Sequence, residues 1–323
     1  LFGATGVFVQ KTNHGGGSPF VRGLTGNQTL LMIDGVRLNN ATYRYGPNQY
    51  FNTIDPYSIS AIEVVRGSGS VQYGSDALGG VIQVFSKDPR FSAKPTVAVQ
   101  LLGKMVSQDM EYSGRGEVEL QSKHLALLVG YTRRKFGNLV GGDTTGVQSP
   151  SGYQEQAWDA KLKVKLCKEA TLSIAHQFVQ QSEVPLYHRV RLENFEYYTF
   201  DPQQRQLTYA KLEYASKWPL LQKITLNSSF QQNSETRKYH KNGNAFEFVE
   251  QDKIRTIGVT LDVQSQLLAN WASNTGVEFY QDKVKSHKNQ VERATNFSTT
   301  QRGLYPNDAL SSNLSIYHLE HYN

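Results

Sequence analysis

The chain has 323 residues, a net charge of +6 with acidic and basic residues interspersed, and a single cysteine, Cys167. One cysteine excludes an internal disulfide framework and a cysteine-based zinc site, and the lack of a Lys/Arg block argues against nucleic-acid binding. No window approaches the ~20 apolar residues that a membrane helix requires, so a membrane protein with this sequence has to be a β-barrel.

Residues 1 to about 90 combine short apolar segments with tight-turn signals. Leu30–Ile33 and Val36–Leu38 flank an Asp-Gly pair, which is a strong signal for a β-hairpin. Ser58–Glu63 is compatible with a short helix that begins at a serine cap, and Val81–Phe85 is typical of a short strand. We therefore predict a small α+β unit with many turns.

Glycines punctuate this first region, and we interpret six of them as residues that serve backbone geometry. They are Gly23, Gly35, Gly67, Gly74, Gly79 and Gly80. A phosphate-binding loop at Gly67–Gly74 is the functional alternative. Its spacing does not match GxGxxG, and a strand rather than a helix follows it, so nucleotide binding is disfavoured.

From about Thr96 onward, long segments alternate polar and apolar residues, as strands with one wet and one apolar face do. Trp158–Leu166 places Trp, Ala, Leu, Val and Leu on one face and Asp and Lys on the other, and Arg255–Gln264 alternates in the same way. We expect roughly eight or nine strands. A soluble β-sandwich or solenoid with amphipathic strands is the alternative.

Long polar stretches separate these strands at every second connection, and short turns lie between them. We predict long loops at Gly137–Gln154, Glu183–Gln204, Arg237–Gln251 and Lys283–Ser311. Aromatic residues near strand ends suggest interfacial girdles: Tyr131, Trp158, Tyr214, Trp218, Trp271 and Tyr280. Short turns on one side and long loops on the other are typical of outer-membrane barrels.

Five segments of the first region form an ordered set: Val21-Arg22-Gly23, Leu30–Asn39, Ile54-Asp55-Pro56, Ile59–Gly67 (ISAIEVVRG) and Ser70–Ile82 (SVQYGSDALGGVI). Their order and spacing closely resemble the plug domain of TonB-dependent receptors. The resemblance implies a small α+β plug domain, residues 1–90, inside an antiparallel transmembrane β-barrel of the bacterial outer membrane. Residues 91–323 would supply the N-terminal part of a barrel with 22 strands. Eight strands close a barrel that their own side chains fill, so a plug of this size requires many more.

The same resemblance implies TonB-dependent uptake of a scarce metal chelate, haem or a ferric siderophore, and no enzymatic activity. The expected partners are the TonB–ExbB–ExbD complex, acting on a TonB box upstream of Leu1, the chelate itself and outer-membrane lipid. We expect no resident cofactor and no metal site, since any iron would belong to the transported ligand. A signal-transducing receptor, or uptake of cobalamin or another bulky nutrient, remains an alternative. A soluble β-rich enzyme or adhesin lacks a catalytic constellation.

Charged plug residues in strand-like settings would face the barrel lumen. The resemblance implies ionic contacts of Arg22, Glu63 and Arg66 with the inner wall. Their candidate partners on the polar face of one wall strand are Asp159, Lys161, Lys163 and Lys165.

The segment Asn40–Asn52 corresponds to an apical plug loop that touches substrate in the family. Its candidate binding residues are Tyr43, Arg44, Tyr45, Asn48, Gln49 and Tyr50, which combine aromatic faces with hydrogen-bond donors.

Haem is favoured because the plug, Glu183–Arg189 and Pro202–Leu207 are similar to segments of haem and haemoglobin receptors. Haem transporters often carry a histidine near the position of Asn48, which argues against haem. A tyrosine of the apical loop, or His188 in a predicted external loop, could replace that histidine as an iron ligand.

Overall fold

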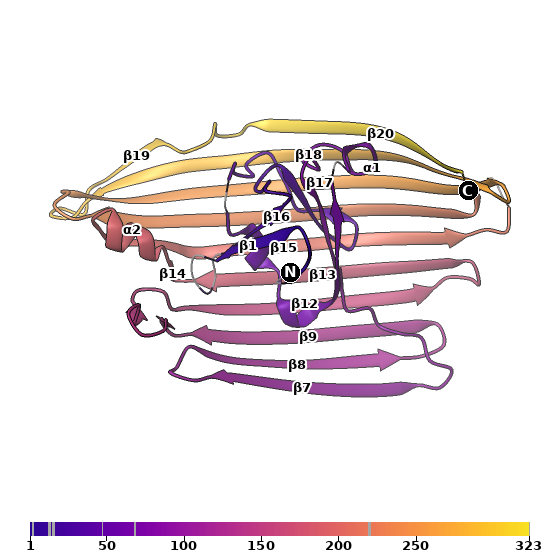
Figure 1. The fold of residues 1–323 in the computed structure, drawn as a ribbon, viewed down its shortest axis with the longest axis horizontal. Coiled ribbons are helices and arrows are strands. Elements are labelled where there is room, and N and C mark those ends of the chain that lie inside the picture. The colour runs from indigo at the N-terminus through magenta and orange to yellow at the C-terminus, as the bar shows by residue number, and fades with distance from the viewer. Residues whose placement is uncertain are drawn as a thin grey trace.

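In the computed structural model, a long, curved antiparallel sheet wraps one side of a small N-terminal domain (Figure 1). The structure describes residues 1, 3–11, 14, 17–46, 48–67, 69–218 and 221–322. The small domain lies across the middle of the sheet's inner face, and the chain passes from it into the first wall strand through residues 87–95. The predicted domain boundary at residue 90 falls in this connection and stays a prediction.

The small domain, called the plug below, contains a two-stranded and a four-stranded sheet. The strands are β1 (Val7–Lys11), β2 (Gly17–Val21), β3 (Thr29–Ile33), β4 (Val36–Arg37), β5 (Ile59–Arg66) and β6 (Gly80–Ser86). The larger sheet has the order β4-β3-β6-β5, with β3 parallel to β6. Three short helical segments complete the plug: η1 (Tyr50–Thr53), η2 (Pro56–Ser58) and α1 (Ser70–Tyr73). The expected α+β unit is therefore confirmed.

The Asp-Gly hairpin is also confirmed, because β3 and β4 pair on either side of Asp34 and Gly35. Both residues have positive φ, 51° and 88°, as a type I′ turn requires. The predicted helix at Ser58–Glu63 is wrong. Ser58 ends η2, and Ile59–Arg66 is a strand paired with β6, which suits its β-branched residues.

The wall is a twelve-stranded antiparallel sheet in the described part of the chain. Its long strands are β7 (Thr96–Val106), β8 (Glu111–Gln121), β9 (Leu125–Phe136), β12 (Tyr153–Lys165), β13 (Ala170–Ser182), β15 (Phe195–Ala215), β16 (Lys223–Lys241), β17 (Phe246–Leu268), β18 (Trp271–Glu292) and β20 (Leu310–Tyr322). The shorter strands β14 (Val184–Pro185) and β19 (Ser298–Arg302) complete this sheet. Outside it, β10 (Leu139–Val140) pairs with β11 (Val147–Gln148), and α2 (Tyr187–Leu192) is a short helix. The antiparallel wall is confirmed, with more strands than the eight or nine expected.

Three of the predicted long loops are mostly strand, and the one expected at Glu183–Gln204 lies largely in β14 and β15. Residues 237–251 lie in β16 and β17 around a short turn, and much of 283–311 lies in β18, β19 and β20. A strand of ~10 residues spans a bilayer, so β15 to β18, with 19 to 23 residues each, continue beyond it. The inner face of such an extension buries polar side chains such as Arg237 and His240, so the alternating polar and apolar pattern that identifies strands from sequence is lost there.

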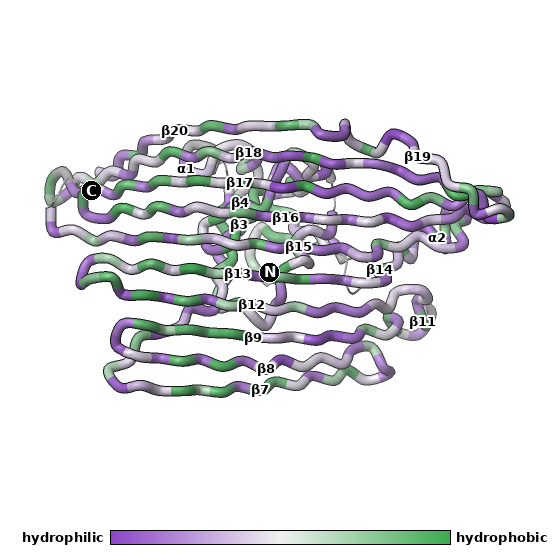
Figure 2. The backbone as a smooth tube through the Cα atoms, turned by 180° about the vertical axis from the view of Figure 1, so that it is seen from behind, coloured by the Kyte–Doolittle hydropathy of each residue, from purple (hydrophilic) through white to green (hydrophobic). Residues whose placement is uncertain are grey.

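The two faces of the wall differ as the alternation predicted. On β17, Ile257, Val259 and Leu261 are exposed on the outer face, whereas Ile254 and Thr256 are buried on the inner face. Figure 2 shows the hydrophobic segments gathered on the strand halves toward the C-terminus, with hydrophilic segments toward β19 and α2. No helix in the described part of the chain is long and apolar enough to cross a membrane.

One of the residues predicted for an aromatic girdle faces the other way. Tyr280 is buried on the inner face, where Arg37 of the plug lies over its ring at 5.9 Å. Tyr131 and Trp158, in contrast, are exposed cross-strand neighbours on the outer face.

Candidate functional site: the contacts between plug and wall

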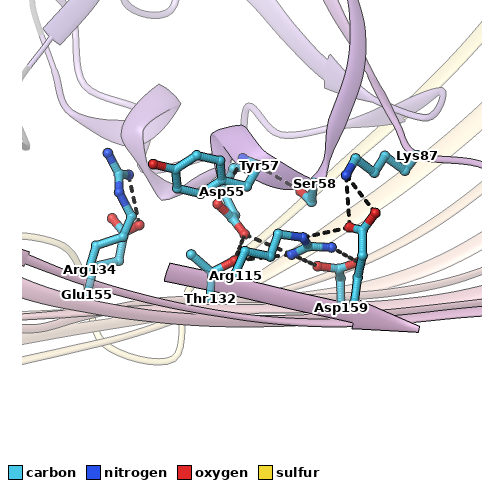
Figure 3. A network of polar contacts seen from close by, with 10 residues as sticks. Asp55, Tyr57, Ser58, Lys87, Arg115, Thr132, Arg134, Glu155 and Asp159 are labelled. Atoms are coloured by element: carbon cyan, nitrogen blue, oxygen red, sulfur yellow. Dashed lines mark hydrogen bonds and ion pairs between the residues drawn. The ribbon is translucent and has the colours of Figure 1, made fainter. Parts of the chain in front are cut away.

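An aspartate beside the 3-10 helix η2 anchors the plug to two wall strands, β8 and β9. Asp55 accepts a hydrogen bond from the Tyr57 backbone amide through Oδ1, at 3.0 Å, which caps η2. Its Oδ2 accepts from Thr132 Oγ1 at 2.6 Å and from Arg115 Nη1 at 3.2 Å (Figure 3). The side chains of Asp55 and Arg115 are only 4% and 2% exposed. One carboxylate thus fixes the local turn and joins it to the wall.

Arg115 is the centre of this anchor. Its guanidinium binds Asp159 through two nitrogens, at 2.8 and 3.1 Å, and Glu117 through Nε at 2.8 Å. Lys87, which follows the last plug strand, pairs with Glu117 at 2.8 Å. A buried arginine is tolerated because carboxylates satisfy its donors.

Asp34 forms a second anchor from the β3–β4 turn. Ser86 donates to it from its backbone amide at 2.9 Å and from its hydroxyl at 2.6 Å, and the wall contributes Tyr209 OH at 2.8 Å and Lys161 Nζ at 3.4 Å. Burial by itself raises the pKa of this carboxyl, but Lys161 and the hydrogen bonds hold the pKa of Asp34 below its ordinary value. Asp34 therefore faces Lys161 as a carboxylate.

The apical segment supplies a third anchor. Arg44 pairs with Glu235 of β16 at 2.9 Å and donates to Tyr50 OH at 3.0 Å. Gln49 Nε2 donates to the same glutamate oxygen at 3.3 Å. These three predicted substrate-binding residues therefore dock the loop against the wall.

Of the other candidate binding residues in the apical segment, two are buried and one is exposed. Tyr43 is buried in the plug core against Tyr50, with ring centroids 4.4 Å apart. Asn48 is buried and exchanges backbone hydrogen bonds of 2.6 Å with the Ser18 hydroxyl. Tyr45 is 75% exposed. Burial raises the pKa of Tyr43 and of Tyr50, so neither favours the phenolate that would bind iron.

The three plug charges predicted to contact the wall do not do so in the described part of the chain. Arg66 Nη1 donates to the Thr5 carbonyl oxygen at 3.1 Å within the plug, and Arg22 lies beside Gly67. Glu63 takes part in no ion pair among the described residues. Glu63 and Arg66 lie on β5, which is largely exposed at the edge of the plug sheet.

The predicted wall partners are engaged by other residues. Lys161 pairs with Asp34, Lys163 pairs with Asp88 at 2.5 Å, and Asp159 pairs with Arg115, whereas Lys165 is exposed. The plug partners were missed because Asp34 and Asp55 occupy turns, where aspartate needs no further explanation.

Contacts of wall side chains with plug backbone groups complete the interface. Wall side chains donate to plug backbone oxygens at Leu38 (from Gln231), Thr42 (from Tyr305), Asn52 (from Gln181) and Thr53 (from Arg205). Asp282 accepts from the Ala41 amide at 2.7 Å. An apolar cluster also crosses the interface, joining Ile33 and Val36 to Ala175, Leu207 and Tyr209 of the wall.

Of the six glycines assigned to backbone geometry, Gly23, Gly35, Gly67, Gly74 and Gly80 have positive φ. Gly79 does not, but a Cβ there would lie 2.7 Å from Leu24 Cβ. Gly80 is the most constrained, since its φ is 157° and a Cβ would lie 2.3 Å from the Val65 carbonyl oxygen.

A small domain held on the polar inner face of a barrel wall is the arrangement that the sequence motifs imply. The family model of the TonB-dependent receptor plug domain matches residues 1–81. Residues 1–81 are therefore a plug domain of the kind found in TonB-dependent receptors. These receptors are β-barrel proteins in the outer membrane of Gram-negative bacteria, so the predicted location is confirmed.

Two curated relatives each match a little under half of this chain. The rhizobactin receptor of Rhizobium meliloti is 27% identical over 150 residues, which cover 45% of this chain and 19% of the relative. The vitamin B12 transporter BtuB of Vibrio cholerae is 33% identical over 160 residues, which cover 46% of this chain and 26% of the relative. The chain thus spans about a quarter or less of their length.

Solved structures show the same fold over nearly the whole chain. The copper transporter OprC superimposes with a TM-score of 0.79 at 14% identity, covering 98% of this chain and 48% of that one. The FrpB iron transporter from Neisseria meningitidis gives 0.73 at 12% identity, covering 97% and 56%. At such identities the likeness establishes the fold alone.

Proposed function

We propose that this receptor takes up a metal chelate, a ferric siderophore or haem, across the outer membrane, driven by the TonB–ExbB–ExbD complex. The observation that carries the proposal is the docking of a plug in the barrel by contacts that water can replace. Asp34, Asp55 and Arg44 hold the plug through charged side chains. A domain that must move aside for its cargo is well served by contacts of this kind, since its released charges are solvated.

The relatives support uptake as the class of activity but differ in cargo. Their names specify rhizobactin, vitamin B12, copper and iron. These relatives are transporters and receptors, which agrees with the expectation that the chain is not an enzyme. A siderophore is the cargo we favour over haem, because the apical tyrosines other than Tyr45 are committed to packing. Cobalamin uptake, or a receptor that signals, is the second candidate, supported by the B12 transporters among the relatives.

Growth of the bacterium that carries the gene provides the test. A deletion strain that carries either the full gene or an empty vector is tested for growth. Ferric siderophores or haem are supplied as the sole source of iron, or cobalamin is supplied as the sole source of that vitamin. We expect growth on at least one ferric siderophore to require the gene. Growth that depends on the gene only with cobalamin would replace the metal chelate by the second candidate.

Replacement of Tyr45 by alanine tests the apical loop. Because Tyr45 is 75% exposed, its loss removes a contact surface without opening the plug core. We expect ligand affinity of the purified full-length receptor to fall several-fold, since aromatic stacking contributes about 0.5–1.5 kcal/mol. Tyr131, which is 49% exposed on the outer face of β9, is the matched control. Equal affinity of both variants and the wild type would remove Tyr45 from the binding site.

A further inference from the structure

Four cations form a compact block on the outer face of the wall. Lys253 and Arg255 lie on β17, and Lys283 and Lys285 lie on β18. Lys253 is directly opposite Lys285, and Arg255 is directly opposite Lys283. Their neighbours Ile254 and Val284 are buried on the inner face, so alternation along each strand places all four on the outside. We call these four residues the cation block.

The chain does little to neutralise the block. Like charges directly opposite each other on a sheet face are destabilising. In the described residues one ion pair reaches the block, between Lys283 and Asp308 at 4.0 Å, and both side chains are more than half exposed. Arg255 Nε donates to the Gln232 amide oxygen at 3.2 Å, which adds no negative charge.

A fifth cation continues the block away from the apolar band. Arg302 of β19 is opposite His287, the next outward position after Lys285 on β18. The next outward position after Lys253 on β17 is Gln251, opposite His287. Positive charge therefore extends along adjacent strands with one nearby acid, an arrangement that an external anion would stabilise.

The block begins where the apolar outer face ends. Ile257, Val259 and Leu261 on β17, and Val277 and Phe279 on β18, are exposed below it. Such a band is the lipid-facing surface of an outer-membrane barrel. The block lies beyond the band on the side of the long connections, and the wall residue beside it, Asp282, contacts the apical plug segment at Ala41. This is the external side, at the level of the outer-leaflet headgroups.

We propose that the cation block binds the phosphorylated headgroup of an outer-leaflet lipid. Paired strands lie ~4.8 Å apart and alternate residues ~6.8 Å apart, so four cations converge on an area the size of a headgroup phosphate. Arginine supplies paired donors to a phosphate, and lysines near an anionic membrane surface add attraction. Water alone would satisfy scattered cations and gives no reason for cross-strand pairs of them.

Lipid binding by the purified full-length receptor tests this surface. The receptor in neutral detergent is titrated with bisphosphorylated lipid A, with its dephosphorylated form and with inorganic phosphate. The test variant is K253Q/R255Q/K283Q/K285Q. The control is R133Q/K135Q, which removes two exposed outer-face cations of β9 that are opposite uncharged residues of β8 and β12. We expect at least a tenfold loss of affinity for bisphosphorylated lipid A in the test variant and less than threefold in the control.

Charge reversal separates binding from a structural role. K285E places a carboxylate opposite Lys253, so it relieves repulsion in the free protein. We expect its Tm in neutral detergent to equal or exceed that of the wild type, while its affinity for bisphosphorylated lipid A falls. If the quadruple variant fails to fold, the affinity of K285E for bisphosphorylated lipid A still tests the proposal.

Three results would overturn the proposal. They are unchanged affinity of K285E, equal binding of the dephosphorylated lipid, and displacement of the lipid by inorganic phosphate at similar concentrations. The last result would identify a site for free phosphate. Ligand uptake is not the readout, so the outcome is independent of the proposed transport function.

Discussion

Replacing Asp55 by asparagine removes the charge that the plug presents to Arg115. The asparagine side chain can still accept from the Tyr57 amide, so the cap of η2 is retained. A hydrogen bond to a buried charged group contributes about 1.5–3 kcal/mol. Because Arg115 keeps Asp159 and Glu117, we expect a loss of about 2 kcal/mol rather than the larger penalty of a bare buried charge.

Hydrogen exchange of the backbone amides around η2 measures this loss in the full-length receptor. If the segment exchanges through local opening, about 2 kcal/mol corresponds to about thirtyfold faster exchange. The control is R66Q, which removes an exposed contact within the plug and should change exchange by less than about twofold.

Combining D55N with R115M tests whether the loss of the Asp55–Arg115 ion pair causes the faster exchange. In R115M, the carboxylates of Asp55, Asp159 and Glu117 remain close together without their shared cation. D55N should then be neutral or protective, because it removes one of three like charges. A thirtyfold acceleration by D55N in both backgrounds would refute the reasoning, since the effect would not depend on Arg115.

The remaining predictions concern other contacts of the plug. Because the pKa of Asp34 is lowered in the folded state, its contribution is present above the ordinary carboxyl pKa and declines as pH falls through the lowered value. The Tm of the wild type should therefore fall more steeply than that of D34N between about pH 4 and 2. Gly80→Ala should destabilise the plug by at least about 2 kcal/mol, measured by urea unfolding, because a Cβ meets a backbone oxygen at 2.3 Å. Gly23→Ala should cost about 1 kcal/mol, since it has positive φ but no atom within 4 Å. Arg44→Gln should accelerate exchange of the apical amides about tenfold, because it removes the charge paired with Glu235; unchanged exchange would show that the loop docks without this pair.

The sequence predicts the wall where one face is apolar, because alternation such as that of Trp158–Leu166 has a period that only a strand satisfies. Prediction of strands from alternation fails where the same strands extend beyond the apolar band. Residues 237–251 contain Arg237, Lys238, Glu247 and Glu250 and were expected to form a loop. In the structure, pairing with adjacent strands, rather than burial of an apolar face, makes them strands.

The anchors are harder to predict than the fold. Arg115 is one of several charges in an alternating strand, and it acts through residues 60 and 44 positions away, Asp55 and Asp159. Neither of these sequence separations produces a pattern that can be recognised in the local sequence. Asp34 is difficult to predict for another reason, because its place in the β3–β4 turn already accounts for an aspartate, although its side chain also contacts the wall residue Lys161. The register of the strands in the assembled sheet decides which charged residues anchor the plug, and this register cannot be read from the local sequence.

The interface also has two kinds of contact that differ in the cost of separation. Where Asp55 meets β8 and β9, and where Arg44 meets β16, charged groups can exchange their partners for water. Where Ile33 and Val36 meet Leu207 on β15, separation exposes apolar surface at about 25 cal/mol per Å². A force that moves the plug as the proposed transport requires would therefore separate the polar contacts at lower cost. The apolar contact with β13 and β15 would hold longest, and Asp34 with Tyr209, beside that contact, would keep the plug sheet against the wall.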